Sequence, residues 1–100
     1  MRYQKRIAAL LLGLAAAGPA RAQTADPQLL ALSCAGCHGP DGHSPGTIPS
    51  LNGKGQATIA DALRQFREGQ RPSTVMGRIA KGYSDAEIDA VAREVATSWK

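Results

Sequence analysis

The side chains best suited to soft metal chemistry are gathered in one short segment of this chain. Cys34, Cys37, His38 and His43 lie within ten consecutive residues, in the order Cys-Ala-Gly-Cys-His-Gly-Pro-Asp-Gly-His. They are the only cysteines and histidines in the sequence. This segment predicts a site for a metal ion or a metal-containing group, and its spacing limits which one.

Two cysteines separated by two residues serve three chemistries. Thioredoxin-like disulfide exchange needs a β-α-β setting, and the chain has no strand-like alternation. A structural zinc ion needs four ligands, and His38 directly after Cys37 makes tetrahedral closure on one ion awkward. The third is covalent haem attachment, for which Cys-x-x-Cys-His is the local signature. We favour one haem c bound through Cys34 and Cys37, with His38 as the proximal iron ligand.

The second axial position of the iron decides between two kinds of chemistry. Methionine there raises the reduction potential of the iron and suits an electron carrier, whereas an open position permits ligand binding or peroxidase-like chemistry. Met76 lies 38 residues beyond His38 and is expected in a loop, not in a helical apolar stripe of the kind that core-filling methionines join. We expect Met76 to be the ligand. His43 is the alternative, but only five residues separate it from His38.

Helices and loops are expected to position these residues. Asp26 and Pro27 predict the start of a helix that runs into the cysteine segment. The stretch from residue 39 to 55 is rich in Gly, Pro, Ser and Asn, and a loop of this length commonly carries function or wraps a ligand. Thr58 is expected to cap a second helix, which Gly69 ends.

The last helix has the clearest pattern in the sequence. Ser-Asp-Ala-Glu at 84–87 is a capping box, and one apolar stripe at helical spacing follows it: Ile88, Val91, Ala92, Val95 and Trp99. The fold class is therefore all-α, with helices and loops wrapped around one covalent haem. A chain this short with few aromatic residues forms a small hydrophobic core. We therefore expect its stability to need a disulfide, a metal or a cofactor.

Residues 1–22 have the pattern of a cleaved secretory signal peptide. A positive head precedes an apolar run at 7–17, and Ala-Arg-Ala at 20–22 is a small-x-small cleavage site. The run is short for a stable span, although an uncleaved anchor is the alternative. We expect residues 23–100 to form one periplasmic domain with no membrane span in the mature chain.

Charge gives little support to a nucleic-acid partner. Four of the twelve basic residues lie in 1–22 and none of the eight acidic ones does, so residues 23–100 carry eight of each. Residues 54–81 hold six basic and two acidic side chains. Arg71, Arg78 and Lys81 either steer a partner or balance haem propionates, or they belong to ordinary solvated faces.

Taken together, Cys34, Cys37, His38 and Met76 resemble the pattern of class I cytochromes c over essentially the whole of residues 23–100. The resemblance implies the small class I cytochrome c fold. It also implies that a proline carbonyl within a Pro-x-Leu segment accepts a hydrogen bond from the proximal histidine. Pro49-Ser50-Leu51 matches that segment, and such a bond would orient the ring and tune the iron.

The run from Ser73 to Ser84 is similar to the methionine segment of the cytochrome subunits of flavocytochrome c sulfide dehydrogenases. This resemblance implies an electron-transfer subunit whose partner is a sulfide-oxidising flavoprotein. Many members of that family have two haem domains, but this chain has one attachment motif, so we expect a single-haem form. The chain shows neither a dinucleotide-binding fingerprint nor a catalytic dyad, so it is not expected to be an enzyme by itself. A stand-alone electron carrier to an oxidase or reductase, and a haem enzyme with an open iron position, are the alternatives.

Overall fold

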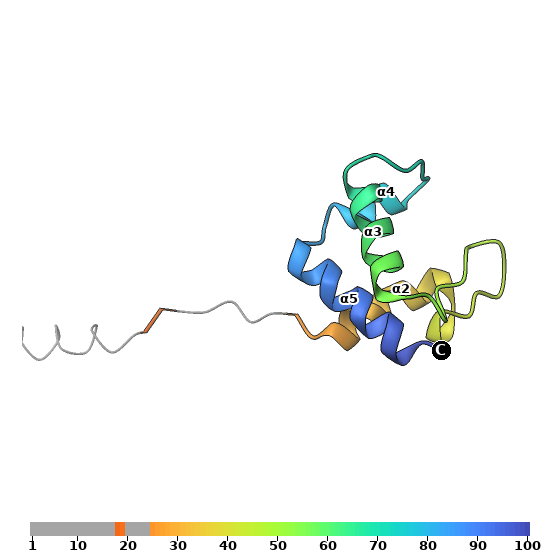
Figure 1. Ribbon diagram of the computed structural model, residues 1–100, viewed down its shortest axis with the longest axis horizontal. Helices are drawn as coiled ribbons and strands as arrows, with labels where there is room; N and C mark the ends of the chain where they lie inside the picture. Colours follow the sequence, from red (N-terminus) through yellow and green to blue (C-terminus); the bar gives the residue numbers. More distant parts are fainter. Residues whose placement is uncertain (1–17, 20–24) are drawn as a thin grey trace, which may run out of the picture.

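The computed structural model describes residues 18, 19 and 25–100. Within them lie four α-helices and one turn of 3-10 helix (Figure 1): α2 (Pro27–His38), η1 (Pro40–Gly42), α3 (Gln56–Arg67), α4 (Met76–Ala80) and α5 (Asp85–Ser98). These residues contain no β-strand, so the predicted all-α class is confirmed.

Helix α5 is the centre of the fold, because it packs against both α2 and α3 while α4 packs against α3 (Figure 1). Its predicted apolar stripe is confirmed as the main wall of the core. The buried apolar side chains that form one cluster are Ala31, Ile59, Ala60, Ile88, Val91, Ala92, Val95 and Trp99. The core is small, and the largest fully buried side chains are Ile88, Val91 and Val95.

The starts of α2 and α5 are fixed by local capping, as the sequence predicts. Asp26 accepts a hydrogen bond from the backbone N–H of Gln28, and proline occupies the first turn of α2. Ser84 and Glu87 form a reciprocal capping box, in which each side chain accepts from the other residue's backbone N–H. Both helices therefore begin where their side chains satisfy otherwise unpaired N–H groups.

The predicted start of the second helix is wrong by three residues, because the cap is Gly55 and not Thr58. Helix α3 begins at Gln56 after Gly55, which provides no side-chain cap, so Thr58 lies inside the first turn. The N–H of Ile59 bonds to the carbonyl of Gly55. The helix therefore begins before the position at which a Thr58 cap would have started it. Gly69 follows the end of the helix with a φ of 73°, as expected for a glycine that ends a helix.

Met76 was expected in a loop, and this is wrong, since it is the first residue of α4. At the start of this five-residue helix the hydroxyl of Ser73 accepts from the N–H of Gly77 at 2.8 Å. The N–H groups of Arg78 and Ile79 bond to the carbonyl of Val75. A helix of little more than one turn is too short to show an apolar period in the sequence.

The long loop after α2 is closed at its base by the C-terminal end of the fold. The carbonyl of Gly42 accepts from Leu51 N–H at 2.8 Å, and Gly53 N–H donates to the carbonyl of Trp99 at 2.9 Å. Gly42 has a φ of 73°, and a β-carbon added there would lie 2.8 Å from the Trp99 ring. Residues 43–50 therefore project as a loop from a fixed base (Figure 1).

The expected signal peptide at 1–22 falls, apart from Gly18 and Pro19, outside the described residues. None of the helices in the described part of the chain has the length and apolar character needed to cross a membrane.

Candidate functional site

The C-terminal half of α2 presents the two thiols and one imidazole. Cys34, Cys37 and His38 follow one another at helical positions i, i+3 and i+4, which face one side of a helix. Cys34 is partly buried, Cys37 is exposed, and both are free thiols. Burial raises the pKa of the Cys34 thiol, and the neighbouring Cys37 adds to this.

The loop that follows α2 returns to the His38 side chain. The Nδ1 atom of His38 lies 2.5 Å from the carbonyl oxygen of Pro49. Since a carbonyl only accepts, Nδ1 carries the proton and Nε2 is the nitrogen with a free lone pair. His38 is buried, with 9% of the residue's surface exposed. This contact fixes the tautomer and the orientation that a metal ligand needs.

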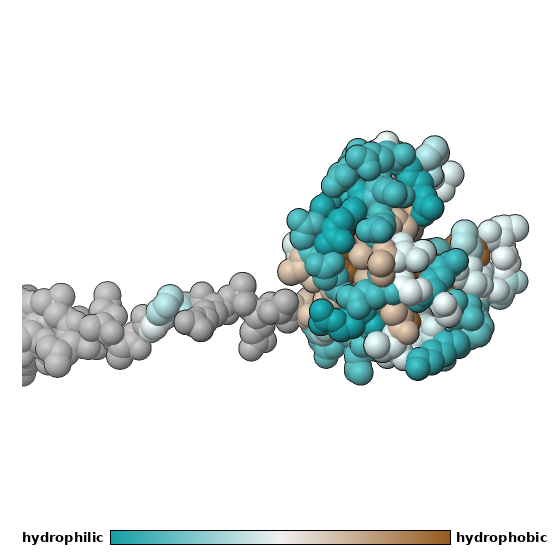
Figure 2. Space-filling model, viewed as in Figure 1, coloured by the Kyte–Doolittle hydropathy of each residue, from teal (hydrophilic) through white to brown (hydrophobic). Residues whose placement is uncertain are grey.

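A hollow lies beside Cys37. Its volume is about 240 Å³, and its lining consists of Cys37 and the loop residues 44–48. On the face drawn in Figure 2, the surface is hollowed between the part that contains α4 and the part that contains residues 43–50. Large apolar side chains stay exposed in both parts, with 42% of Ile48, 53% of Val75 and 44% of Ile79 accessible. Such exposure fits a surface built to contact an apolar group.

The donor set fits a covalent haem better than a bare ion. Among the described residues, no group of three or more His, Cys, Asp or Glu side chains is placed to hold a metal ion. Two free thiols instead lie one helical turn apart, next to an open hollow and a histidine with Nε2 available. This is the arrangement that thioether attachment and one axial imidazole require.

The remaining candidate ligands lie elsewhere. Met76 is half-buried at the start of α4, a helix that contacts α3. The Nε2 atom of His43 lies 3.1 Å from the backbone oxygen of Lys100, and its ring is exposed. The structure thus brings together Cys34, Cys37, His38 and Pro49 directly. It keeps Met76 on a separate element and directs His43 toward the C-terminal end.

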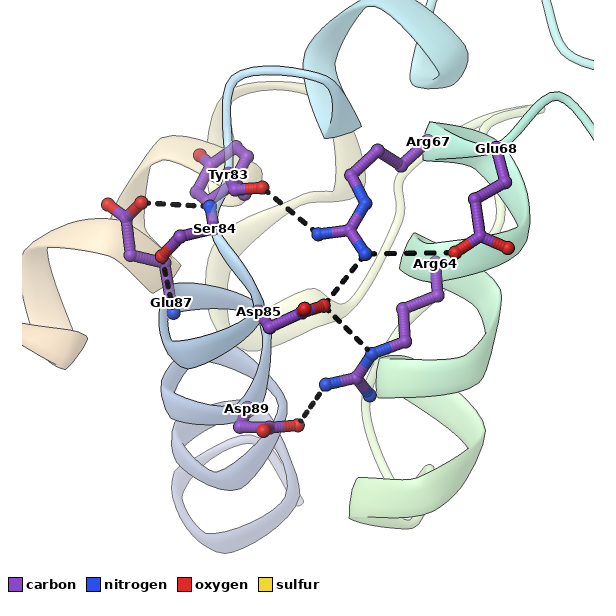
Figure 3. Close-up of polar contacts among 8 residues, drawn as sticks. All are labelled: Arg64, Arg67, Glu68, Tyr83, Ser84, Asp85, Glu87 and Asp89. Atoms are coloured by element: carbon purple, nitrogen blue, oxygen red, sulfur yellow. Dashed lines mark hydrogen bonds and ion pairs between the residues drawn. The ribbon is translucent and has the colours of Figure 1, made fainter.

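A set of ion pairs between α3 and α5 was missed by the sequence analysis (Figure 3). Arg64 contacts Asp85 at 3.3 Å and Asp89 at 2.7 Å, and Arg67 contacts Asp85 at 2.7 Å and Glu68 at 3.7 Å. Hydrogen bonds and charge from Arg67, then from Arg64, lower the pKa of Asp85. The spacing of two bases on one helix and two acids on the next was the available signal.

Comparison with known proteins defines the class of the chain. The cytochrome c family model matches residues 24–97, so the chain belongs to the cytochrome c family. It is an electron-transfer protein that carries covalent haem c and is not an enzyme by itself.

Three relatives show which kinds of cytochrome the chain is similar to. The chain is 49% identical over 86 residues to the cytochrome subunit of sulfide dehydrogenase of Chlorobaculum tepidum, covering 80% of this chain and 78% of that protein. It is 37% identical to the thiosulfate dehydrogenase electron acceptor of Stutzerimonas stutzeri, covering 86% of this chain but only 42% of that protein. It is 34% identical to cytochrome c-553 of Helicobacter pylori, covering 72% of this chain and 77% of that protein.

Proposed function

We propose that this protein is a periplasmic, single-haem c-type cytochrome that accepts single electrons from a sulfide-oxidising flavoprotein. The observation that carries the proposal is the 49% identity to a cytochrome subunit of sulfide dehydrogenase across 78% of that subunit's length. The chain's single Cys-x-x-Cys-His motif supports one haem. Haem c supplies one-electron iron chemistry when it is bound.

Each residue of the site has a role in this proposal. Cys34 and Cys37 hold the haem covalently, and His38 and Met76 are the axial iron ligands. The carbonyl of Pro49 keeps His38 in the tautomer with Nε2 free, which is supported by the 2.5 Å contact at Nδ1. The partly buried Cys34 and the exposed Cys37 leave one edge of the site accessible, as electron exchange with another protein requires.

Export is part of the same proposal. Residues 1–22 act as a signal peptide, and residues 23–100 form the mature domain. The pattern of positive head, short apolar run and small-x-small site supports this.

The partner is expected to dock around α4. Between Gly69 and Ser84 the chain has no acidic residue and carries Arg71, Arg78 and Lys81, all exposed. Arg64 and Arg67 are engaged in ion pairs with α5, so they add little to this face. Arg71 lies over the Phe66 ring at 5.3 Å, which leaves Arg78 and Lys81 as the candidates for a docking rim that faces acidic groups.

The test first asks whether a flavoprotein copurifies with the cytochrome. It then compares haem reduction by sulfide with and without that flavoprotein. Catalytic reduction only in the presence of the flavoprotein is the expected result. Arg78→Gln and Lys81→Gln are expected to slow it and to reduce its salt dependence, whereas Arg93→Gln on α5 serves as a charge-matched control. Equal reduction without the flavoprotein, or the absence of a complex, would contradict the proposed partner.

A stand-alone soluble carrier is the second candidate function. The similarity to cytochrome c-553 of Helicobacter pylori over 77% of that protein favours it. Under this alternative the cytochrome purifies alone and exchanges electrons with an oxidase or reductase. Strong binding of carbon monoxide by the reduced protein would instead favour a haem enzyme with an open iron position.

A further inference from the structure

Tyr83 joins three parts of the fold at the end of the segment from residue 68 to 83, which carries Met76 and is called the Met76 segment. Its hydroxyl lies 3.0 Å from the Ser33 hydroxyl on α2. Its carbonyl accepts from Arg67 on α3 at 3.4 Å. Its ring packs against the core, and its N–H bonds to the carbonyl of Ala80 at the end of α4. Figure 3 shows the carbonyl directed toward Arg67 and the ring on the other side.

The direction of the hydroxyl contact follows from its neighbours. Ser33 has one hydroxyl proton, and it donates that proton to the carbonyl of Leu30 at 2.6 Å. The Ser33 oxygen therefore accepts from Tyr83, whose phenolic proton is free to donate. Ser33 directly precedes Cys34 on the helix that carries both thiols and His38. The bond thus ends beside the haem-attachment segment.

The other end of the Met76 segment is closed by the ion pairs. Arg67 is the last residue of α3, and it reaches across to both the Tyr83 carbonyl and the Asp85 carboxylate (Figure 3). The chain from residue 68 to 83 therefore leaves and re-enters the fold at one place. Fixing both ends of such a loop reduces the number of conformations that it can take.

We propose that Tyr83 is a positioning residue, which ties the segment bearing Met76 to the helix bearing Cys34, Cys37 and His38. The inference rests on the proposed function, because it assigns Met76 as an iron ligand. The bond between Tyr83 and Ser33 spans 50 residues of sequence and connects the two segments that supply the two axial ligands. Loss of this bond leaves α2 and α4 folded, but it makes Met76 easier to displace.

The experiment measures how readily imidazole displaces Met76 in the oxidised holoprotein. Imidazole is titrated while the long-wavelength sulfur-to-iron absorption band is followed. Tyr83→Phe keeps the packed ring and removes only the hydroxyl. Its apparent affinity for imidazole is expected to rise roughly two- to fivefold, the effect of one solvent-exposed hydrogen bond.

Four further variants separate positioning from general weakening of the fold. Ser33→Ala should raise the affinity as Tyr83→Phe does, and the double variant should add nothing further, since both remove the same bond. Ser33→Thr retains the hydroxyl and should behave as wild type. Thr97→Val removes a side-chain hydrogen bond to Arg93 on α5 and should leave the imidazole affinity unchanged.

The outcomes for this inference and for the proposed function are distinct. A wild-type protein with the band, and a Tyr83→Phe variant with unchanged imidazole affinity, would overturn the positioning role alone. Additive effects of Tyr83→Phe and Ser33→Ala would also overturn it. A wild-type protein without the band would overturn the Met76 assignment and this inference together.

Discussion

At the scale of single residues, the two proposed iron ligands, His38 and Met76, are held in place to different extents. His38 is buried, and its Nδ1 contacts the Pro49 carbonyl at 2.5 Å, so its ring is oriented before any metal binds. Met76 is half-buried at the first position of a short helix, and its unbranched side chain is flexible. The methionine side of the site therefore depends more on the segment that carries it.

Met76→Ala is expected to abolish the sulfur-to-iron absorption band of the oxidised protein and to lower its reduction potential, because methionine ligation raises the potential. Alanine favours helix, so α4 should persist and the change should report ligation. Absorption spectroscopy and a redox titration give the two readings.

Two variants make the Met76 result specific. Val75→Ala changes the exposed neighbour and should leave the band in place. His43→Ala should do so as well, since His43 contacts the Lys100 backbone. Persistence of the band in Met76→Ala would show that another group is the ligand.

At the scale of elements, α3 and α5 are joined by apolar contacts and by charge. Ile59 and Ala60 of α3 meet Ile88, Val91 and their neighbours in the core. Outside the core, Arg64 and Arg67 face the acids of the first turns of α5 (Figure 3). Surface ion pairs contribute little singly, but here two guanidinium groups share the carboxylate of Asp85.

Asp85→Asn is expected to destabilise the holoprotein slightly at neutral pH, and the difference from wild type should shrink in acid. Arg67 and Arg64 lower the pKa of Asp85 below its usual 3.8, so its charge stabilises the fold above that value. That contribution is lost as the pH falls through the lowered pKa. Chemical denaturation at neutral pH and at a pH below the lowered pKa checks this.

Asp61→Asn is the matched control for this prediction. Asp61 lies on the exposed surface of α3, and none of the ion pairs among the described residues includes it. Its substitution should change the stability similarly little at both pH values. An Asp85→Asn variant whose deficit grows in acid would contradict the assigned role of the ion pairs.

At the scale of the whole molecule, the core is too small to account for a stable fold. Among the residues that the structure describes, the largest fully buried side chains are Ile88, Val91 and Val95, and Leu29 and Leu32 on α2 are 66% and 60% exposed. Domains of this size bury a modest fraction of their surface and usually need a staple or cofactor. Covalent haem is expected to be that component.

Replacing both Cys34 and Cys37 by serine is therefore expected to leave a largely unfolded, protease-sensitive chain. The double variant loses covalent attachment while the rest of the sequence stays the same. Far-UV circular dichroism and limited proteolysis, compared with the wild-type holoprotein, provide the measurement. A cooperative, helix-rich protein without haem would contradict the inferred contribution of the cofactor to the core.

Sequence alone determined the features that depend on neighbouring residues. The Cys-x-x-Cys-His segment predicted haem because its reactive groups are contiguous. The starts of α2 and α5 were predictable because a cap and its partner are two or three residues apart. The apolar stripe of α5 was predictable for the same reason, since its period is local. Pro49 was recognised only through a family resemblance.

Tertiary structure decided the features that join distant segments. The contact of His38 with Pro49 spans 11 residues, the Arg64–Asp89 pair 25, and the Tyr83–Ser33 bond 50. Such pairs form only after loops close and helices pack. The residue types alone do not show which distant segments come into contact. The helical start at Met76 likewise depends on the packing of α4 against α3, because one helical turn by itself is not stable in water.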